Sequence, residues 1–296
     1  MKAMILAAGR GERLRPITDT CPKPLVKVGD KSLIEWHLEK LKKAGVTDIL
    51  INSAYLSSMI VSYLGDGHKF GVNITHSVEG DSGLETAGGI INALPFFEGE
   101  DFLVVNGDTF IDGDYKQFLT PLKAGVQARL YLVNNPEHNL KCDFSLDEKG
   151  MCIRGTGYTF SGTAVYSCQG FEHHEIKKEP LLPYFEKWSQ EKILTGALLE
   201  GKWFDVGTIQ RLDTVNNYVT RETRSFSLSM PMMTTSISSP TLSTSDGCEI
   251  RPQLMSVICS RPSTPPRSMN APKSVMFLTT PLRSSSTFIS PSSLLR

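Results

Sequence analysis

A loop rich in glycine and arginine follows the first apolar run of the sequence, and its residue types suit phosphate chemistry. Residues 6–16 are Leu-Ala-Ala-Gly-Arg-Gly-Glu-Arg-Leu-Arg-Pro. The glycines at 9 and 11 would let backbone N–H groups approach phosphate oxygens closely, and the arginines supply charge that a triphosphate needs. The loop lacks the third glycine of the dinucleotide fingerprint and the Gly-Lys-Ser/Thr of a Walker loop. Taken alone, it also fits a turn with solvated arginines.

A lysine between two prolines follows this loop in the sequence, as Pro22-Lys23-Pro24. Because proline fixes its own φ, the segment is stiff and could hold the Lys23 ammonium toward a bound ligand. A lone lysine is more often a solvated surface residue. Lys23 therefore becomes a candidate site residue only together with the loop that precedes it.

Two aspartates stand where a metal ion could be held beside phosphates. Asp108 follows the apolar run 102–105, and Asp205 lies just ahead of the last helix that the sequence predicts. Mg²⁺ is typically bound by one or two carboxylates plus substrate phosphates. The alternative roles are local, since Asp108 could cap a turn and Asp205 could be the negative charge at the start of a helix.

A fourth motif combines Glu79-Gly80 with the segment 84–89, which reads Leu-Glu-Thr-Ala-Gly-Gly. Glycine has no Cβ, so the backbone here could pass close to a flat base or a ribose. A helix N-terminus with a close-packing glycine explains the same pattern without a ligand. This motif alone does not separate the two explanations.

The elements that must position these motifs alternate between short apolar runs and helical patterns, which is typical of an α/β fold with a largely parallel sheet. Ser32 and Glu35 form the pattern of a capping box at the start of one helix, and Gly45 follows its end. The expected strands are residues 2–8, 48–52, 72–76, 101–105, 128–133, 143–146 and 162–166. The expected helices are residues 32–44, 56–64, 86–94, 181–191 and a last one from 208. Ligands bind at the carboxyl ends of strands in open parallel sheets, which is where the first motif lies.

Composition excludes several other classes of protein. The 296 residues carry 31 basic and 31 acidic side chains, and the only dense basic stretch runs from residue 10 to 43, so we expect no nucleic-acid partner. The six cysteines form no Cys-x-x-Cys pair, which indicates neither a zinc site nor a disulfide framework. The apolar opening is too short for a signal peptide, and no run approaches the about eighteen residues of a membrane span. We therefore expect a cytoplasmic protein with no membrane partner.

The four motifs, in this order and spacing, resemble the sugar 1-phosphate nucleotidyltransferase family over nearly all of residues 1–221. The resemblance implies a Rossmann-like nucleotide-diphospho-sugar transferase fold with a mostly parallel central sheet. It also implies an enzyme that joins a nucleoside triphosphate to a sugar 1-phosphate and releases pyrophosphate, with Mg²⁺ as cofactor. A catalytically silent nucleotide-sugar sensor on the same fold is the non-enzyme alternative. Joint retention of Lys23, Asp108 and Asp205 argues against a sensor.

The resemblance also assigns residues to each part of the expected site. The implied catalytic residues are Arg13 and Lys23, and the implied metal ligands are Asp108 and Asp205. The implied nucleotide-binding residues are Ala8, Gly9, Gly11, Glu79, Gly80, Thr86 and Gly88, with Glu79 facing the base. The implied sugar-binding residues are Asn106, Asp143 and Gly162.

Within the family, the chain is most similar to the compact N-acetylmuramate 1-phosphate uridylyltransferases of bacterial cell-wall recycling. The similarity lies in the loop 134–138 followed by Asp143-Phe144, in the segment 159–162, and in the fourth motif. UTP and N-acetylmuramate 1-phosphate are thus the expected substrates. GTP with mannose 1-phosphate, and dTTP or UTP with glucose 1-phosphate, are the alternatives. The oligomeric state, monomer or dimer, stays open.

The last part of the sequence differs from the rest. Residues 222–296 contain 19 Ser and nine Pro but no Tyr or Trp, and no helical or strand period persists there. We expect a nucleotidyltransferase domain at 1–221 and a disordered Ser/Pro-rich tail at 222–296. An out-of-frame extension would give the same composition. The segment shows no hexapeptide repeat of the kind that extended family members carry as a β-helix.

Overall fold

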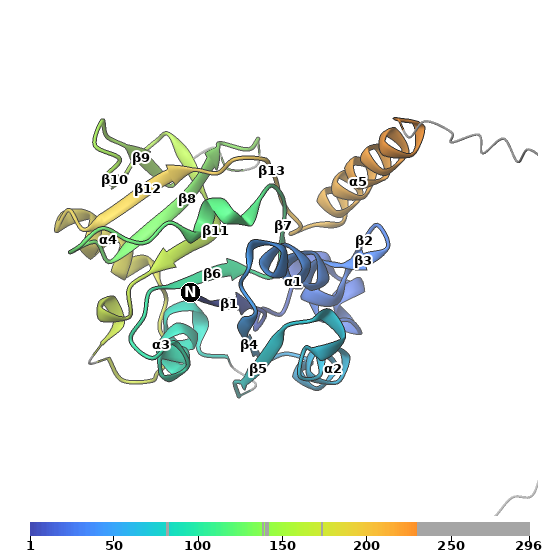
Figure 1. Cartoon of the computed structure of the whole chain (residues 1–296), viewed down its shortest axis with the longest axis horizontal. Helices are drawn as coiled ribbons and strands as arrows, with labels where there is room; N and C mark the ends of the chain where they lie inside the picture. Colours follow the sequence, from blue (N-terminus) through green and yellow to red (C-terminus); the bar gives the residue numbers. More distant parts are fainter. Residues whose placement is uncertain (81–82, 138, 140–141, 173, 230–296) are drawn as a thin grey trace, which may run out of the picture. The chain divides into compact units, whose positions relative to one another are not determined.

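The computed structural model describes residues 1–80, 83–137, 139, 142–172 and 174–229 of the chain (Figure 1). Strands and helices alternate along the first half of these residues, as the sequence pattern predicts. No helix in this part of the chain is long and apolar enough to cross a membrane. The expected tail at 222–296 falls mostly on residues 230–296, which lie outside the described residues, so its disorder stays a prediction.

The central sheet has nine strands, and its first half is parallel. Strand β1 lies between β4 and β6, and β5 pairs with the far side of β4, all in parallel register. The bounds of these strands are β1 (Lys2–Leu6), β4 (Asp48–Ser53), β5 (Asn73–Val78) and β6 (Phe102–Asn106). Because their carboxyl ends meet at one edge, the loops that follow them meet there too.

The second half of the sheet continues from β6 with mixed direction. Strand β11 pairs antiparallel with both β6 and β8, and β12 runs parallel to β8. The bounds are β8 (Ala128–Asn134), β9 (Phe144–Leu146), β10 (Cys152–Arg154), β11 (Tyr158–Tyr166) and β12 (Leu194–Leu198). The predicted α/β class is confirmed, whereas β10 and β12 are strands that the sequence pattern did not predict.

Two small ribbons lie outside the central sheet. Strands β2 (Lys27–Val28) and β3 (Lys31–Ser32) form one, and β7 (Thr109–Asp112) pairs antiparallel with β13 (Lys202–Asp205) in the other. Neither ribbon was expected, because each strand has two or four residues and shows no clear period. The β7 and β13 ribbon matters most, since it ends at two of the predicted site residues.

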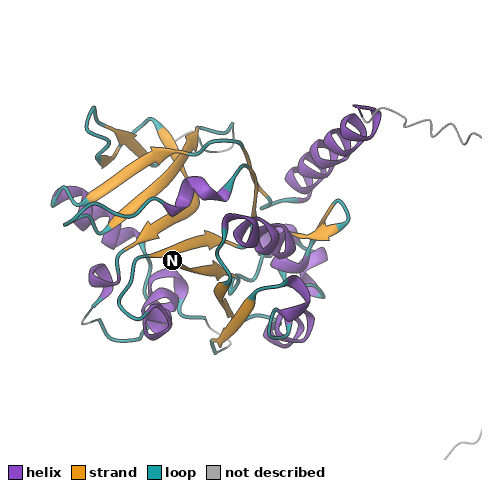
Figure 2. Ribbon diagram, viewed as in Figure 1, coloured by secondary structure: helices purple, strands orange, loops and turns teal. Residues whose placement is uncertain are grey.

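Helices cover both faces of the sheet (Figure 2). They are α1 (Leu33–Ala44), α2 (Ser57–Leu64), α3 (Glu85–Phe97), α4 (Leu182–Gln190) and α5 (Ile209–Ser229). The short 3-10 helices are η1 (Glu12–Leu14), η2 (Ile17–Asp19), η3 (Lys23–Leu25), η4 (His68–Phe70), η5 (Tyr115–Leu119) and η6 (Cys168–Phe171). Helix α5 runs past residue 221, where the sequence pattern placed the end of the domain.

The predicted capping box of α1 is present. The Ser32 N–H donates to Glu35 Oε2 at 2.7 Å, and Gly45 ends the helix with a φ of 92°. These contacts satisfy backbone groups that the first and last turns of a helix leave without partners. A local sequence pattern is therefore enough to set both ends of α1.

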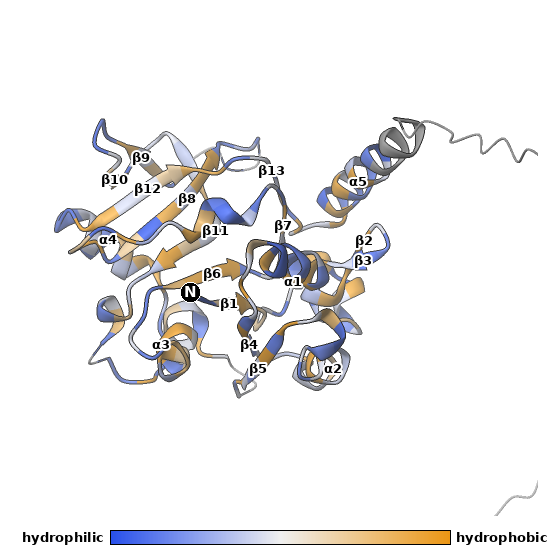
Figure 3. Cartoon of the chain, viewed as in Figure 1, coloured by the Kyte–Doolittle hydropathy of each residue, from blue (hydrophilic) through white to orange (hydrophobic). Residues whose placement is uncertain are grey.

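The core divides between the two faces of the sheet because neighbouring residues of a strand point in opposite directions. Met4 packs in the cluster that includes residues of α3 and α4, while Ala3 and Ile5 pack against α1 and α2. The side chains of Ala3, Met4 and Ile5 are all fully buried, which explains the continuous apolar run of β1 (Figure 3). A third cluster joins the loops that form the candidate site. We call it the site-side core, and it consists of Leu14, Val26, Val28, Leu33, Phe110, Val206, Leu212 and Val215.

His37 links α1 to the strand that follows Asp108. Its side chain is buried, with Nδ1 2.7 Å from the Tyr115 hydroxyl and Nε2 2.8 Å from the Thr109 carbonyl. Burial lowers the pKa of His37 to about 4, from an ordinary value of 6.5. The imidazole is therefore neutral in the fold and has a structural role.

This pKa makes folding stability depend on pH. The folded-state pKa of His37 is depressed. The stability that its neutral imidazole contributes is therefore fully present above the unfolded-state pKa, and it is lost as the pH drops toward the folded-state pKa. Lowering the pH from about 7 to about 5 should cost about 2 kcal/mol of unfolding free energy through this one group. Urea denaturation of the wild type and His37→Asn at both pH values measures it. The loss of unfolding free energy should be smaller in His37→Asn than in the wild type. A variant of the exposed His68 should lose as much as the wild type. Equal losses in all three proteins would contradict the assignment.

Candidate active site

A cleft of about 720 Å³ opens at the carboxyl ends of the parallel strands. It is lined by the glycine and arginine loop after β1, by the Lys23 segment and by the ends of β4 and β6. The predicted site residues in its wall are Ala8, Gly9, Gly11, Arg13, Lys23, Thr86, Asn106 and Asp108. The fold thus brings residues from all four sequence motifs into one cavity.

Gly11 fits the loop for two reasons. Its φ is 66°, in the left-handed region, and a Cβ there would lie 2.9 Å from Cγ2 of Thr18 and 3.2 Å from Cβ of Lys23. The Thr18 hydroxyl also donates to the Gly11 carbonyl at 2.8 Å. The loop therefore packs directly on the lysine segment, and a larger residue would separate them.

Lys23 is held almost out of solvent. Its side chain is 7% exposed, and Nζ lies 2.7 Å from Oδ2 of Asp108, whose side chain is 41% exposed. Pro24 is the second residue of η3, so the backbone on that side is fixed. An ammonium and a carboxylate thus meet in the wall of the cleft.

Asp108 and Asp205 lie at the same end of the β7 and β13 ribbon. Asp205 is opposite Thr109 in the register, and the Val206 N–H donates to the Asp108 carbonyl at 3.2 Å. Asp205 Oδ2 accepts from Nη1 of Arg211 at 2.7 Å. A pair of carboxylates on one ribbon has the donor chemistry that fits a Mg²⁺ ion shared with phosphates. The described residues contain no group of three or more His, Cys, Asp and Glu that could hold a metal without a substrate.

Glu79 lies behind the wall of the cleft. It is 6% exposed, Oε1 accepts from Nδ2 of Asn52 at 2.8 Å, and Oε2 accepts from the Leu84 N–H at 2.7 Å. Asn52 Oδ1 accepts from the Ala7 N–H at 3.0 Å. This chain of contacts ties the loop after β1 to the segment before α3. Asn52 and Gly83, which the sequence analysis missed, line the cleft in place of Glu79.

Gly80 and Gly88 also lie outside the cleft wall. Gly88 is buried, and a Cβ there would overlap the Lys177 carbonyl, while its N–H donates to the Glu179 carbonyl at 3.2 Å. Close packing therefore explains Gly88, which is the alternative that the sequence left open. Gly80 is exposed, with nothing near its missing Cβ. A nucleotide-binding role for these two glycines stays a prediction.

A second cavity of about 470 Å³ adjoins the cleft, and Leu6, Glu85, Thr86 and Asn106 line both. All three predicted sugar-binding residues, Asn106, Asp143 and Gly162, are in its wall. Gly162 has a φ of 80°, and a Cβ there would lie 2.5 Å from Nδ2 of Asn106. The two residues are therefore in close contact across the junction.

The wall of the second cavity contains several aromatic residues and one arginine that the sequence analysis missed. Phe144, Phe160 and Phe185 line it together with Arg154. The Arg154 guanidinium lies 5.3 Å from the centre of the Phe144 ring, and Nη1 donates to the Asp143 carbonyl at 3.2 Å. Arg154 gives no local sequence signal, because only the β9 and β10 pairing brings it to this cavity.

Comparison with known proteins places these observations in a family. A family model described as "Nucleotidyl transferase" matches residues 2–140. An N-acetylmuramate alpha-1-phosphate uridylyltransferase of Neisseria meningitidis serogroup B is 48% identical over 220 residues, which cover 72% of this chain and 95% of the relative. A mannose-1-phosphate guanyltransferase of Neurospora crassa is 32% identical, covering 70% of this chain and 61% of that protein.

Solved structures agree with the sequence matches. A putative glucose-1-phosphate thymidylyltransferase from Bacillus anthracis superposes with a TM-score of 0.64 and 25% identity, covering 74% of this chain and 94% of that structure. The nearly full-length match to the Neisseria protein and the family model confirm the prediction made from the four motifs. The chain belongs to the nucleotidyl transferase family.

Proposed function

We propose that this protein joins UTP to N-acetylmuramate 1-phosphate, releases pyrophosphate and serves cell-wall recycling in the cytoplasm. The observation that carries the proposal is the junction at Asn106, where a cleft lined by cations adjoins a cavity with aromatic side chains and one arginine in its wall. A triphosphate suits the first cavity and a sugar suits the second. The 48% identity to the Neisseria uridylyltransferase supports UTP and N-acetylmuramate 1-phosphate among the family's substrates.

The site contains the groups that this transfer needs. An oxygen of the sugar phosphate forms a bond to the α-phosphorus of UTP while the bond from that phosphorus to the β-bridging oxygen breaks, and pyrophosphate leaves with the electron pair. The attacking phosphate is already ionised at neutral pH, so no general base or covalent intermediate is required. Catalysis is then positioning and charge neutralisation. Arg13 and Lys23 line the cleft and can neutralise the phosphates.

Enzymes of this family generally use a divalent metal, and we propose Mg²⁺ here. Asp108 and Asp205 are the residues that would hold it, because both are carboxylates at one end of a ribbon beside the cleft. Bound there, the ion would neutralise charge on the transferred phosphate. A silent nucleotide-sugar sensor would have no need of this carboxylate pair together with Lys23.

Arg154 offers a reason for the choice of sugar. Muramate differs from glucosamine by a lactyl group that ends in a carboxylate, and an arginine recognises a carboxylate strongly. The exposed guanidinium contacts the Phe144 ring and donates to the Asp143 carbonyl. We therefore propose that Arg154 pairs with the lactyl carboxylate.

A pyrophosphate-release screen of four nucleoside triphosphates against a panel of sugar 1-phosphates tests the function. UTP with N-acetylmuramate 1-phosphate should exceed every other pair in kcat/KM by about tenfold or more. A higher value for GTP with mannose 1-phosphate, or dTTP with glucose 1-phosphate, would replace the substrates and keep the reaction. Binding of nucleotides without release from any pair would favour the sensor.

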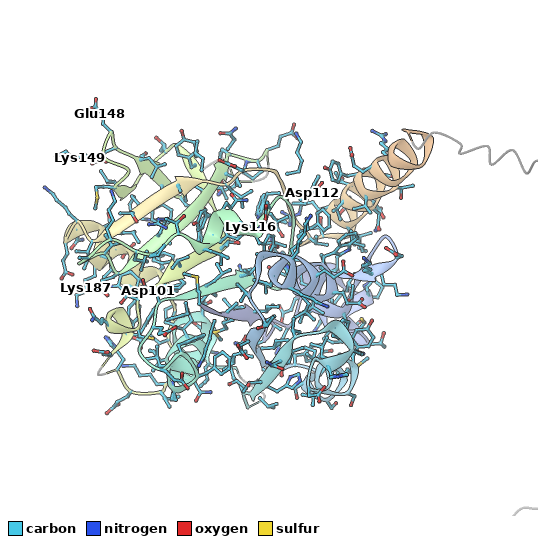
Figure 4. The ribbon with its side chains drawn as sticks, in the orientation of Figure 1. Asp101, Asp112, Lys116, Glu148, Lys149 and Lys187 are labelled. Atoms are coloured by element: carbon cyan, nitrogen blue, oxygen red, sulfur yellow. The ribbon has the colours of Figure 1, made fainter. Side chains whose placement is uncertain are left out.

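Replacing Arg154 tests the sugar assignment separately. Arg154→Gln should lower kcat/KM for N-acetylmuramate 1-phosphate by about 10- to 100-fold, because a charged hydrogen bond is lost. The value for N-acetylglucosamine 1-phosphate, which lacks the lactyl group, should change little. Lys149→Gln is the matched control, since Lys149 is exposed in the turn between β9 and β10 (Figure 4). An equal loss for both sugars would show that Arg154 only supports the fold.

Asparagine at either proposed metal position tests the metal assignment. Asp108→Asn or Asp205→Asn should cut kcat by about 10²-fold or more while the thermal melt stays cooperative, because each removes a negative ligand. Asp112→Asn is the control, because Asp112 is a carboxylate at the far end of β7 from Asp108 and does not line the cleft. Near-normal turnover in either variant at ordinary Mg²⁺ would remove that residue from the site.

A further inference from the structure

Each aspartate that we assign to the metal forms an ion pair with a basic side chain of the protein. Lys23 Nζ lies 2.7 Å from Asp108, and Arg211 Nη1 lies 2.7 Å from Asp205. Lys23 is part of the expected site, whereas neither the sequence motifs nor the proposed reaction assigns a role to Arg211. Its position in the fold nevertheless brings its guanidinium to the cleft.

Arg211 stands in the first turn of α5, and its guanidinium is placed against the backbone of Gly207. A Cβ on Gly207 would lie 2.5 Å from Nη2 of Arg211, 2.8 Å from Oδ1 of Asp205 and 3.1 Å from Nη2 of Arg13. Gly207 itself lines the cleft. Two guanidinium groups and one carboxylate therefore converge on a single point of the cleft wall.

This arrangement leaves one buried donor unused beside the cleft. Among the described residues, Nε of Arg211 is buried without a hydrogen-bond partner. An arginine with a free donor is costly to keep from water unless an anion can reach it. Two guanidinium groups also repel each other, and the single carboxylate offsets only one of their two charges. The site is thus incomplete until a further anion arrives.

We propose that Arg211 is an exchangeable counter-ion. In the free protein it neutralises Asp205, and when a divalent metal and a triphosphate bind together it gives up Asp205 and faces a phosphate oxygen instead. The inference rests on the proposed function, because it takes Asp205 as a metal ligand. A metal alone would have to break the ion pair and leave the guanidinium beside another cation, so the metal binds poorly without the triphosphate.

Exchange of this kind couples the two ligands. The triphosphate strengthens metal binding because it receives the released guanidinium, and the metal strengthens triphosphate binding by the same factor. Arg211 is the residue through which this coupling passes. Removing it should therefore have opposite effects on the metal alone and on the metal with its anion.

Metal binding by the full chain, measured without turnover, tests the proposal. Free Mn²⁺ is followed by electron paramagnetic resonance, and the preformed complex of Mn²⁺ with inorganic tripolyphosphate by calorimetry. Arg211→Gln should bind Mn²⁺ alone about three- to tenfold tighter than the wild type, and should bind the complex about tenfold weaker. Arg211→Lys keeps the charge, and both of its affinities should lie between those of the wild type and those of Arg211→Gln.

Two controls separate exchange from a general change in charge. Lys40→Gln removes one positive charge from the ion pair with Asp112, which lies outside the cleft wall, and should leave both affinities unchanged. In an Asp205→Asn background, Arg211→Gln should no longer tighten Mn²⁺ binding. The proposal is overturned if the wild type and Arg211→Gln bind Mn²⁺ equally, or if the effect persists without the Asp205 carboxylate. Neither measurement needs the proposed substrates, so a failed substrate screen and a failed exchange are distinguishable.

Discussion

The ion pair between Lys23 and Asp108 is the interaction on which the candidate site depends. An ammonium that is 7% exposed has lost most of its hydration, which is costly unless a carboxylate meets it in good geometry. The surroundings act to keep that geometry. Gly11 lets the loop after β1 pack on the lysine stem, and His37 holds the Thr109 carbonyl next to Asp108. A change at either position would move one charge away from the other.

The site-side core explains why segments far apart in sequence remain together at this point. It joins Leu14 from the loop after β1, Val26 from the lysine segment, Phe110 from β7, and Val206 and Val215 around the start of α5. All of these are nearly or fully buried, so each contributes apolar area that would otherwise face water. The charged groups of the cleft are thus carried on a packed apolar layer, and the ribbon of β7 and β13 fixes the two aspartates relative to it.

Sequence reasoning was sufficient wherever the signal is local. The ends of α1 follow from Ser32, Glu35 and Gly45, and the parallel strands follow from apolar runs such as β1. The sequence alone did not indicate which distant residues come into contact. Nothing near Gly88 indicates that the Lys177 carbonyl will pack on it, and nothing near Glu79 indicates that Asn52 will donate to it. The same limit applies to Arg154 and Arg211, whose places in the site depend on strand pairing and on where α5 begins.

The two ion pairs of the cleft share an electrostatic cause. A cleft that must bind a triphosphate needs several cations, but cations that line a free cleft repel one another and lose hydration. The protein meets both demands by setting a carboxylate against a cation at two points, Asp108 with Lys23 and Asp205 with Arg211. The carboxylates offset the repulsion among these cations, and they are also the groups that suit a divalent metal. In the free protein these four side chains neutralise one another in pairs, and in the proposed exchange the same cations would turn to the phosphates while the carboxylates hold the metal.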